Sequence, residues 1–180
     1  MISNKKVATA ILTMIACIWL CGVMEARGVR KVVVRSAYNE YISNNLSSAY
    51  RYPSSSYIYY DINNDGVEEL IFRFAFRGMQ NGYKVFTYKK GTVYETIPEM
   101  RAVYCVYYNK KKKRICFYDS TGAIMNRYTE YRLKGTVLRK VTSFYISDEY
   151  EDGRFFKDTR YITENKYNNS VRKYQKWKRF

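Results

Sequence analysis

The sequence contains no histidine and only two prolines among its 180 residues. Without histidine, the chain cannot build a histidine-based triad, a histidine general base or a histidine-ligated metal centre. No internal repeat of about 20 to 50 residues is visible. The basic residues also follow no spacing that is typical of a nucleic-acid-binding module. These absences weaken several enzyme classes and leave a single, non-repetitive domain as the simplest organisation.

Acidic residues are half as numerous as basic ones, with 16 Asp and Glu against 32 Lys and Arg, and the formal net charge is +16. Residues 1–26 carry a net +1, which leaves +15 for the rest of the chain. Such a charge attracts polyanions such as nucleic acid, anionic lipid or acidic wall polymers, although it can also serve solubility alone. Hydrophobic residues make up 47% and the 21 tyrosines favour strands, so the sequence predicts a globular, β-rich domain.

The first 26 residues have the pattern of an export signal. Lys5 and Lys6 precede an apolar run over residues 7–24, and a basic start before an apolar stretch is typical of a secretory signal. We expect cleavage near Ala26. An uncleaved membrane anchor through residues 7–24 and a lipoprotein signal at Cys17 are the alternatives. We therefore predict a signal peptide or anchor over 1–26 and one exported domain, secreted or at the cell surface, over 27–180.

The remaining chain predicts an α+β fold, an antiparallel β meander of about seven to nine strands with a helix at each end. Apolar residues at helical spacing predict a helix over Arg30–Leu46, and Thr163 can cap a C-terminal helix that places Val171, Tyr174 and Trp177 on one face. In the expected strand over residues 69–76, the phenylalanines alternate with Arg73 and with Arg77, the residue after the strand, so we expect the arginines to face solvent. The expected strands are 57–60, 69–76, 83–88, 92–97, 102–108, 114–118, 125–133, 137–146 and 155–156.

An acidic loop connects the first two of these strands. It reads Asp61-Ile62-Asn63-Asn64-Asp65-Gly66-Val67-Glu68-Glu69-Leu70. Oxygen-bearing side chains at alternate positions followed by a glycine can wrap a hard cation such as Ca²⁺. An EF-hand is excluded because its twelfth position is Phe72 and strands, not helices, flank the loop. The simpler alternative is a hydrogen-bonded turn at Asn64-Asp65-Gly66 that binds no metal.

This loop resembles the strand–loop–strand calcium loops of FG-GAP and related exported repeat domains. That resemblance implies side-chain ligands at Asp61, Asn63, Asp65 and Glu69, a carbonyl ligand at Val67, and a structural Ca²⁺. With the segment 107–119 and the turn after Leu133, the chain is similar to small uncharacterised exported proteins of anaerobic Gram-positive gut bacteria. The wider resemblance implies one exported α+β domain and no known activity. The chain departs from the pattern at Asn64 and Glu68, neither of which is expected to bind the ion.

Two further features of the middle of the chain suggest contacts. A two-residue turn at Lys110-Lys111 would place Cys105 directly opposite Cys116, where a cross-strand disulfide can form, although two free thiols are the equal alternative. The basic run Lys110, Lys111, Lys112, Lys113 and Arg114 suits a solvated hairpin tip. It can also contact an anionic polymer.

These observations favour a non-enzymatic exported domain with a structural Ca²⁺ loop that binds a surface protein or an anionic polymer. The expected membrane contact is limited to residues 7–24, if they are retained, and export argues against nucleic acid as the partner. The alternative is an exported hydrolase acting on wall or glycan, for which Glu40, Glu95 and Glu130 are candidate carboxylates.

Overall fold

The computed structural model describes residues 30–46, 55–77, 80–97, 100–121, 124–147 and 153–180. The predicted leader over residues 1–26 and its expected cleavage point therefore lie outside the described residues. Within the described ranges, no helix is both long enough and apolar enough to cross a membrane.

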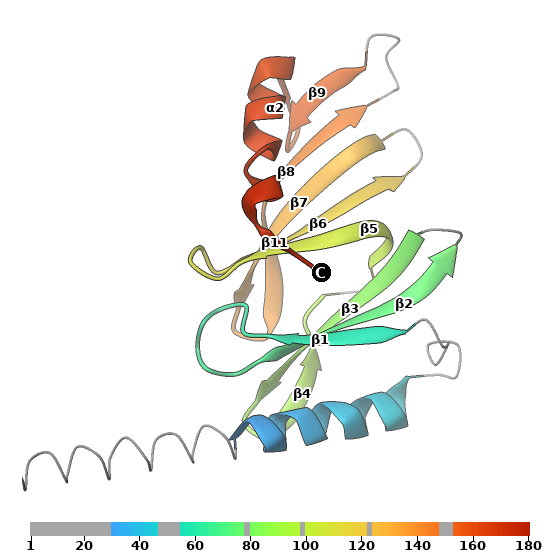
Figure 1. The fold of residues 1–180 in the computed structure, drawn as a ribbon, viewed down its shortest axis with the longest axis vertical. Helices are drawn as coiled ribbons and strands as arrows, with labels where there is room; N and C mark the ends of the chain where they lie inside the picture. Colours follow the sequence, from blue (N-terminus) through green and yellow to red (C-terminus); the bar gives the residue numbers. More distant parts are fainter. Residues whose placement is uncertain (1–29, 47–54, 78–79, 98–99, 122–123, 148–152) are drawn as a thin grey trace, which may run out of the picture.

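The described strands form one antiparallel sheet in the order β1-β2-β3-β5-β6-β7-β8-β9-β10, with β4 paired to β3 and β11 paired to β5 (Figure 1). The predicted α+β class is confirmed, but the sheet has eleven strands rather than seven to nine. The difference includes β10 and β11, which are too short to show a periodicity of two. The strands are β1 (Ser56–Tyr60), β2 (Glu69–Arg77), β3 (Gln80–Lys89), β4 (Thr92–Glu95), β5 (Met100–Asn109), β6 (Arg114–Thr121), β7 (Ile124–Lys134), β8 (Val137–Ser147), β9 (Arg154–Lys157), β10 (Arg160–Ile162) and β11 (Lys178–Arg179).

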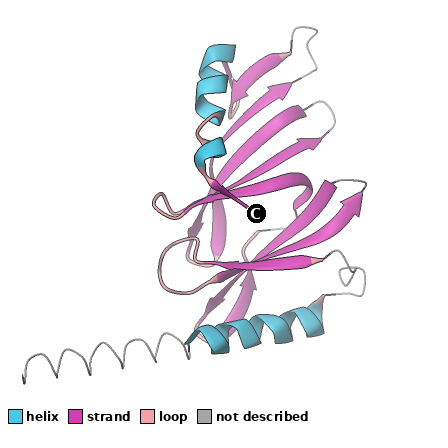
Figure 2. Ribbon diagram, viewed as in Figure 1, coloured by secondary structure: helices cyan, strands magenta, loops and turns pink. Residues whose placement is uncertain are grey.

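A helix lies at each end of the chain, as predicted (Figure 2). The N-terminal helix covers residues 30–45. Helix α2 (Glu164–Val171) begins after Thr163, whose side chain accepts a hydrogen bond from the Lys166 backbone N–H. The prediction that this helix continues to Trp177 is wrong, because the chain tightens into the 3₁₀ turn η2 (Tyr174–Lys176) and then extends as β11.

The open edge of β5 explains why the C-terminal helix stops early. Strand β11 pairs with β5 at Tyr107 and Tyr108, and the Phe180 N–H donates to the Val106 carbonyl at 2.9 Å. Extended residues gain these backbone hydrogen bonds, which a longer helix would leave unmade. Tyr174 and Trp177 are still buried, as the predicted apolar face requires.

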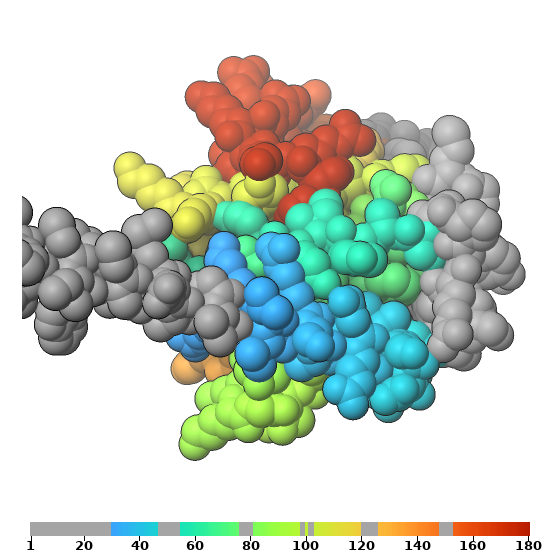
Figure 3. Space-filling model, turned by 60° about the horizontal axis from the view of Figure 1, so that its bottom comes forward, coloured from blue at the N-terminus to red at the C-terminus, as the bar shows by residue number. Residues whose placement is uncertain are grey.

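Both helices cover the same side of the sheet, which we call the outer face. The N-terminal helix packs Val34 and Tyr38 against Leu70, Phe72 and Phe86, near one end of the sheet. At the other end lies the C-terminal segment, which comprises α2, η2 and β11. Its Tyr167, Tyr174 and Trp177 pack against three outer-face residues of the sheet, Cys116, Phe144 and Ile162. Figure 3 shows the N-terminal helix (blue) beside β1 (teal), with the C-terminal segment (red) on the far side of β1.

The opposite, inner face holds the largest core cluster. Ile71 and Val85 alternate with the outer-face residues of β2 and β3, and they pack with residues of β5 to β8. The sheet bends until the Leu138 N–H donates to the Thr96 carbonyl at 2.9 Å, so the start of β8 meets the end of β4. Arg73 also lies on the inner face, paired with buried Tyr83 of β3. It is half-buried there, so the prediction that it faces solvent is wrong.

Candidate functional sites

The acidic loop joins β1 to β2, as predicted. Tyr60 and Glu69 are paired across the two strands and close the loop at its base. Two loop residues have left-handed backbone conformations, Asn64 with φ 58° and Gly66 with φ 86°. Asn and Gly are the residues that adopt this conformation most readily, so they allow the chain to reverse here.

The first half of the loop is closed by hydrogen bonds from its own backbone. The two carboxylate oxygens of Asp61 accept from the N–H groups of Asp65 and Gly66 at 3.1 and 3.0 Å. The Asn63 side-chain oxygen also accepts from the Asp65 N–H at 3.0 Å. Asp65 in turn accepts from the Val67 N–H at 2.8 Å and from the Asn63 amide at 2.9 Å. This is the hydrogen-bonded turn that the sequence left open as the alternative to a metal loop.

Glu69, the last predicted ligand, is 0% exposed. Its carboxylate accepts from the Ile62 N–H at 2.7 Å and from the Thr87 hydroxyl at 3.1 Å. No lysine or arginine of the described chain forms an ion pair with it. Burial raises the pKa of Glu69 to about 8, and the charges of Asp65 and Asp61 add to this effect, against the two hydrogen bonds. The loop therefore contains a buried acid whose charge is not compensated by a basic side chain.

The predicted ligands match calcium in chemistry but are not gathered into a cage. Asp61, Asp65 and Glu69 supply hard carboxylate oxygens, and each has acceptor capacity beyond the hydrogen bonds it already makes. Among the residues that the structure describes, however, no three acidic or cysteine side chains lie close enough together to hold a metal ion. An ion would therefore have to draw these oxygens together from the hydrogen-bonded turn.

Glu68 has a different role that its sequence position did not reveal. Its carboxylate pairs with Lys31 at 3.1 Å and with Arg35 at 2.7 Å, both on the N-terminal helix. The Tyr38 hydroxyl donates to the Glu68 carbonyl at 2.9 Å. Partial burial opposes ionisation of Glu68, but the two cations outweigh it and lower its pKa. The acidic loop is thus also the point at which the N-terminal helix attaches.

The register of the β5–β6 hairpin differs from the predicted one by two residues. Asn109 pairs with Arg114, so residues 110–113 form a four-residue turn, and Cys105 lies opposite Tyr118 instead of Cys116. The turn is stabilised by Asn109, whose side-chain oxygen accepts from the Lys112 N–H at 2.9 Å. Asparagine is a frequent turn residue for this reason, and it is the signal in the sequence that could have given the register.

Cys105 and Cys116 are buried free thiols in this register. Because the shift is an even number of residues, both thiols still face the same side of the sheet, as diagonal neighbours. Diagonal Cα atoms in a sheet are about 7–8 Å apart, which is beyond the usual span of a disulfide. Burial raises the pKa of the Cys116 thiol, and the charge of Glu130 adds to this.

The hairpin tip forms a basic surface together with the end of the chain. Lys110, Lys111, Lys112 and Lys113 are all exposed. Strand β11 pairs with β5 next to this tip and places exposed Lys178 opposite Tyr108 and exposed Arg179 opposite Tyr107. In Figures 1 and 3 the C-terminal segment (red) lies beside this hairpin (yellow). We call these six residues the basic tip.

Arg114, the fifth residue of the predicted polyanion contact, does not belong to this surface. Its Nε donates to Glu130 at 3.1 Å and its side chain is mostly buried. Glu130 also accepts from Lys173 and Tyr174. Of the other candidate carboxylates, Glu95 pairs with Lys84 at 3.0 Å and Glu40 is exposed on the N-terminal helix. The three candidate glutamates thus lie on three separate elements: Glu40 on the N-terminal helix, Glu95 on β4 and Glu130 on β7.

No model of a protein family, no curated protein and no solved structure matches the chain.

Proposed function

We propose that this protein is a non-enzymatic, secreted or cell-surface domain that binds an anionic polymer through the basic tip. The observation that carries the proposal is the pairing of β11 with β5, which brings Lys178 and Arg179 beside the lysines of residues 110–113. Two basic segments that are distant in the sequence thus lie side by side and together carry six formal positive charges. A cluster of this size attracts a chain of phosphate or carboxylate groups without requiring a particular sequence.

The charge balance around the tip supports this function. In the described part of the C-terminal half, Asp119, Glu130 and Asp158 each form ion pairs with basic residues that do not belong to the basic tip. Arg114 and Lys173 neutralise Glu130, so the lysines at 110–113 are left to interact with solvent or a partner. A surface of unneutralised lysines is costly to fold because the charges repel one another, and a polyanion removes that cost.

The test is to replace the four tip lysines, Lys110 to Lys113, with glutamine in the full chain and to measure binding of inorganic polyphosphate by fluorescence anisotropy. We expect the Kd to rise at least about tenfold and its dependence on salt concentration to become shallower. The matched control replaces four other exposed basic residues, Arg132, Lys134, Arg139 and Lys157, with glutamine. An equal loss of binding in both variants would show that net charge alone drives binding, and it would overturn the basic tip as the site.

A second proposal concerns the acidic loop, where we infer a structural Ca²⁺ ion held by Asp61, Asn63, Asp65, Glu69 and the Val67 carbonyl. The observation that favours it is the buried, uncompensated carboxylate of Glu69 next to two further acids. A divalent cation would neutralise these charges and tie the start of β2 to the loop. The ion would hold two strands in register and would not activate water.

This proposal predicts that Ca²⁺ raises the melting temperature of the full chain. Ligand at about one hundred times its Kd stabilises the folded state by roughly 2.7 kcal/mol. Asp61→Ala and Glu69→Gln should both abolish the response, whereas Glu40→Ala, which removes an exposed acid from the N-terminal helix, should keep it. Calorimetric titration with Ca²⁺ measures the same site directly. A wild-type protein that shows no heat of binding and no thermal shift with Ca²⁺ has a simple turn in this loop.

A further inference from the structure

The inner face of the sheet has a cavity beyond its core cluster, on the side that neither helix covers. It has a volume of about 450 Å³, which is within the usual range for sites that bind small molecules. Arg127 and Thr129 of β7 line it, while Tyr128 and Glu130 alternate with them and contact Tyr174 on the outer face. The cavity therefore arises from strand alternation at a place where no helix or strand of the described residues covers the inner face.

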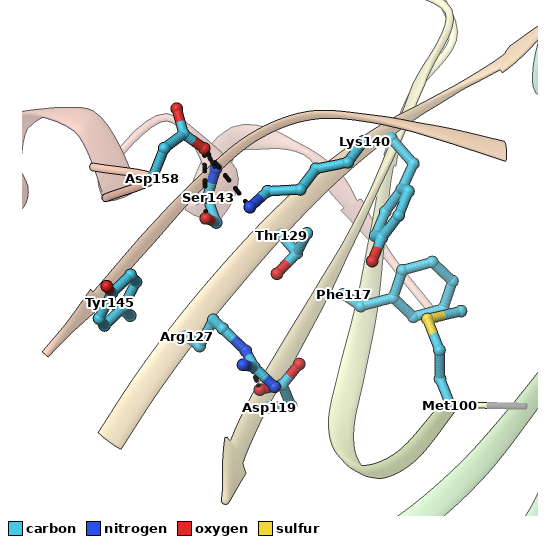
Figure 4. Close-up of a pocket in the computed structure, with 10 residues that line it drawn as sticks. Met100, Phe117, Asp119, Arg127, Thr129, Lys140, Ser143, Tyr145 and Asp158 are labelled. Atoms are coloured by element: carbon cyan, nitrogen blue, oxygen red, sulfur yellow. Dashed lines mark hydrogen bonds and ion pairs between the residues drawn. The ribbon is translucent and has the colours of Figure 1, made fainter. Parts of the chain in front are cut away.

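Two ion pairs lie in the wall of this cavity, as Figure 4 shows. Arg127 Nε donates to Asp119 at 2.8 Å, and the Lys140 ammonium lies 3.6 Å from Asp158. Asp158 also accepts from the Ser143 N–H at 2.8 Å and from its hydroxyl at 3.3 Å. The two pairs lie on either side of Thr129. The cavity thus offers two carboxylates and two cations, and these four groups have no net charge.

One end of the cavity continues into a row of aromatic rings. Tyr145 lines the cavity and stacks on Phe156 of β9, with ring centroids 5.0 Å apart and an interplanar angle of 10°. Phe156 meets Tyr161 of β10 edge to face at 6.2 Å. The register pairs Tyr145 with Phe156 and Phe156 with Tyr161, so all three rings lie on the inner face. Tyr161, at the edge of the sheet, is 65% exposed.

This combination restricts the chemistry of a ligand. A polyanion would bring negative charge against Asp119, which is only 8% exposed, and against Asp158. A wholly apolar ligand would remove water from four charged groups without replacing its hydrogen bonds. A hydroxyl group can donate to a carboxylate and accept from an ammonium or guanidinium group at the same time. A sugar ring carries several such hydroxyls, and it also has apolar C–H faces that can lie on Tyr145.

We propose that this cavity and the Tyr145–Phe156–Tyr161 row form a binding site for a neutral oligosaccharide. One sugar unit occupies the cavity between the two ion pairs, and the following units lie along the aromatic row toward the edge of the sheet. The site binds without hydrolysis, because both carboxylates are already engaged with cations. It is independent of the basic tip and of the acidic loop, since it shares no residue with either.

The test is isothermal titration calorimetry of the full chain with neutral hexasaccharides and disaccharides of glucose and of N-acetylglucosamine. Lys140→Ala, which changes a partly exposed side chain in the cavity wall, should weaken binding of both ligand lengths by about tenfold. Tyr161→Ala should weaken the hexasaccharide about fivefold and leave the disaccharide unchanged. Tyr57→Ala is the matched control, because Tyr57 is 54% exposed on β1, outside both the cavity and the aromatic row.

The outcomes separate this proposal from the others. The variant that lacks the four tip lysines should bind the sugars as the wild type does, so loss of polyphosphate binding leaves this test unaffected. Absence of heat with every neutral sugar at millimolar concentration would overturn the proposal. Sugar binding that survives both Lys140→Ala and Tyr161→Ala would place the site elsewhere, and release of new reducing ends would show that the site is catalytic instead.

Discussion

Glu69 and Glu130 are two buried glutamates in different halves of one sheet, and the chain compensates their charges in opposite ways. Glu130 is 6% exposed on β7 and accepts from Arg114 Nε, from Lys173 Nζ and from the Tyr174 hydroxyl, each at 3.1 Å. Glu69 is 0% exposed on β2, and its partners are a backbone N–H and a threonine hydroxyl. The first carboxylate is neutralised by two cations. The second has no basic partner in the described chain, and the charges of Asp65 and Asp61 act on it instead.

The two halves of the molecule therefore differ in how a buried carboxylate is compensated. In the C-terminal half the protein's own cations pair with it, whereas in the N-terminal half its charge depends on the pH of the solution. A buried charge must be paired or lose its charge by taking up a proton. In the C-terminal half, β6 and the C-terminal segment supply the pairing cations. In the N-terminal half, Glu69 has no basic partner among the described residues, and its raised pKa favours uptake of a proton. A metal ion, as proposed above, would be the alternative. We therefore expect pH and calcium to act mainly through β1, β2 and their loop.

The largest effect should follow from breaking the compensated site. Glu130→Ala would leave Arg114, with a mostly buried side chain, without its anion. Removing one partner of a buried ion pair costs about 3 kcal/mol or more, because the remaining charge stays desolvated. Urea titration followed by circular dichroism should show this loss as a lower midpoint with an unchanged slope.

Glu40→Ala is the comparison for this variant, because it removes an acid that is exposed on the N-terminal helix. Its cost should stay below about 0.5 kcal/mol, as for most surface substitutions. If Glu130→Ala costs no more than Glu40→Ala, the Arg114–Glu130–Lys173 arrangement does not stabilise the fold, and Glu130 and Glu69 do not differ in how their charges are compensated.

The next effect concerns the pH dependence that Glu69 gives to folding. Its pKa is about 8 in the folded protein, against 4.5 for an unperturbed glutamate. The folded state therefore binds more protons than the unfolded state between these values, so its contribution to stability is full below about pH 4.5 and is lost as pH rises to 8. The slope in this window is at most about 1.4 kcal/mol per pH unit.

Glu69→Gln should remove this slope, because glutamine keeps the shape and an acceptor oxygen but does not titrate. Thermal melts of the wild type and the variant from pH 5 to about pH 9, without calcium, measure the difference. Above pH 8 the variant should be the more stable protein. A wild type whose stability does not fall across this window, relative to the variant, would show that Glu69 is already neutralised.

The periodic parts of the molecule could be predicted from the sequence. Apolar spacing gave the helix over residues 30–45, and Thr163 gave the start of α2. Glycines at turn positions predicted most of the hairpins correctly. Gly91 and Gly135, for example, have positive φ angles that other residues adopt only at a cost in free energy. The sequence also predicted the loop between β1 and β2, because this loop is a cluster of acidic residues in a strongly basic chain.

What the sequence did not reveal depends on contacts between distant residues. Arg114 looked like part of a solvated basic run, and only the return of the C-terminal segment shows that it pairs with Glu130 beside Lys173. The sequence placed Lys178 and Arg179 at the end of a helix, whereas in the structure they form a strand that pairs with the edge of β5. The inner-face cavity is assembled from β5 to β8 and the β9–β10 turn, so no local pattern marks it.

The smallest effect on stability should come from Glu68, the neighbour of Glu69. Basic side chains of the N-terminal helix compensate its negative charge. Its carboxylate pairs with Lys31 and Arg35, whose side chains are 55% and 46% exposed. Exposed pairs contribute about 0–1 kcal/mol, so Glu68→Gln should lower the stability by less than 1 kcal/mol in urea titration. The loss should shrink further in high salt, which screens exposed charges. A larger loss that does not respond to salt would mean that Glu68 attaches the N-terminal helix as firmly as a buried pair does. The N-terminal half would then contain a strongly compensated acid directly beside its uncompensated one.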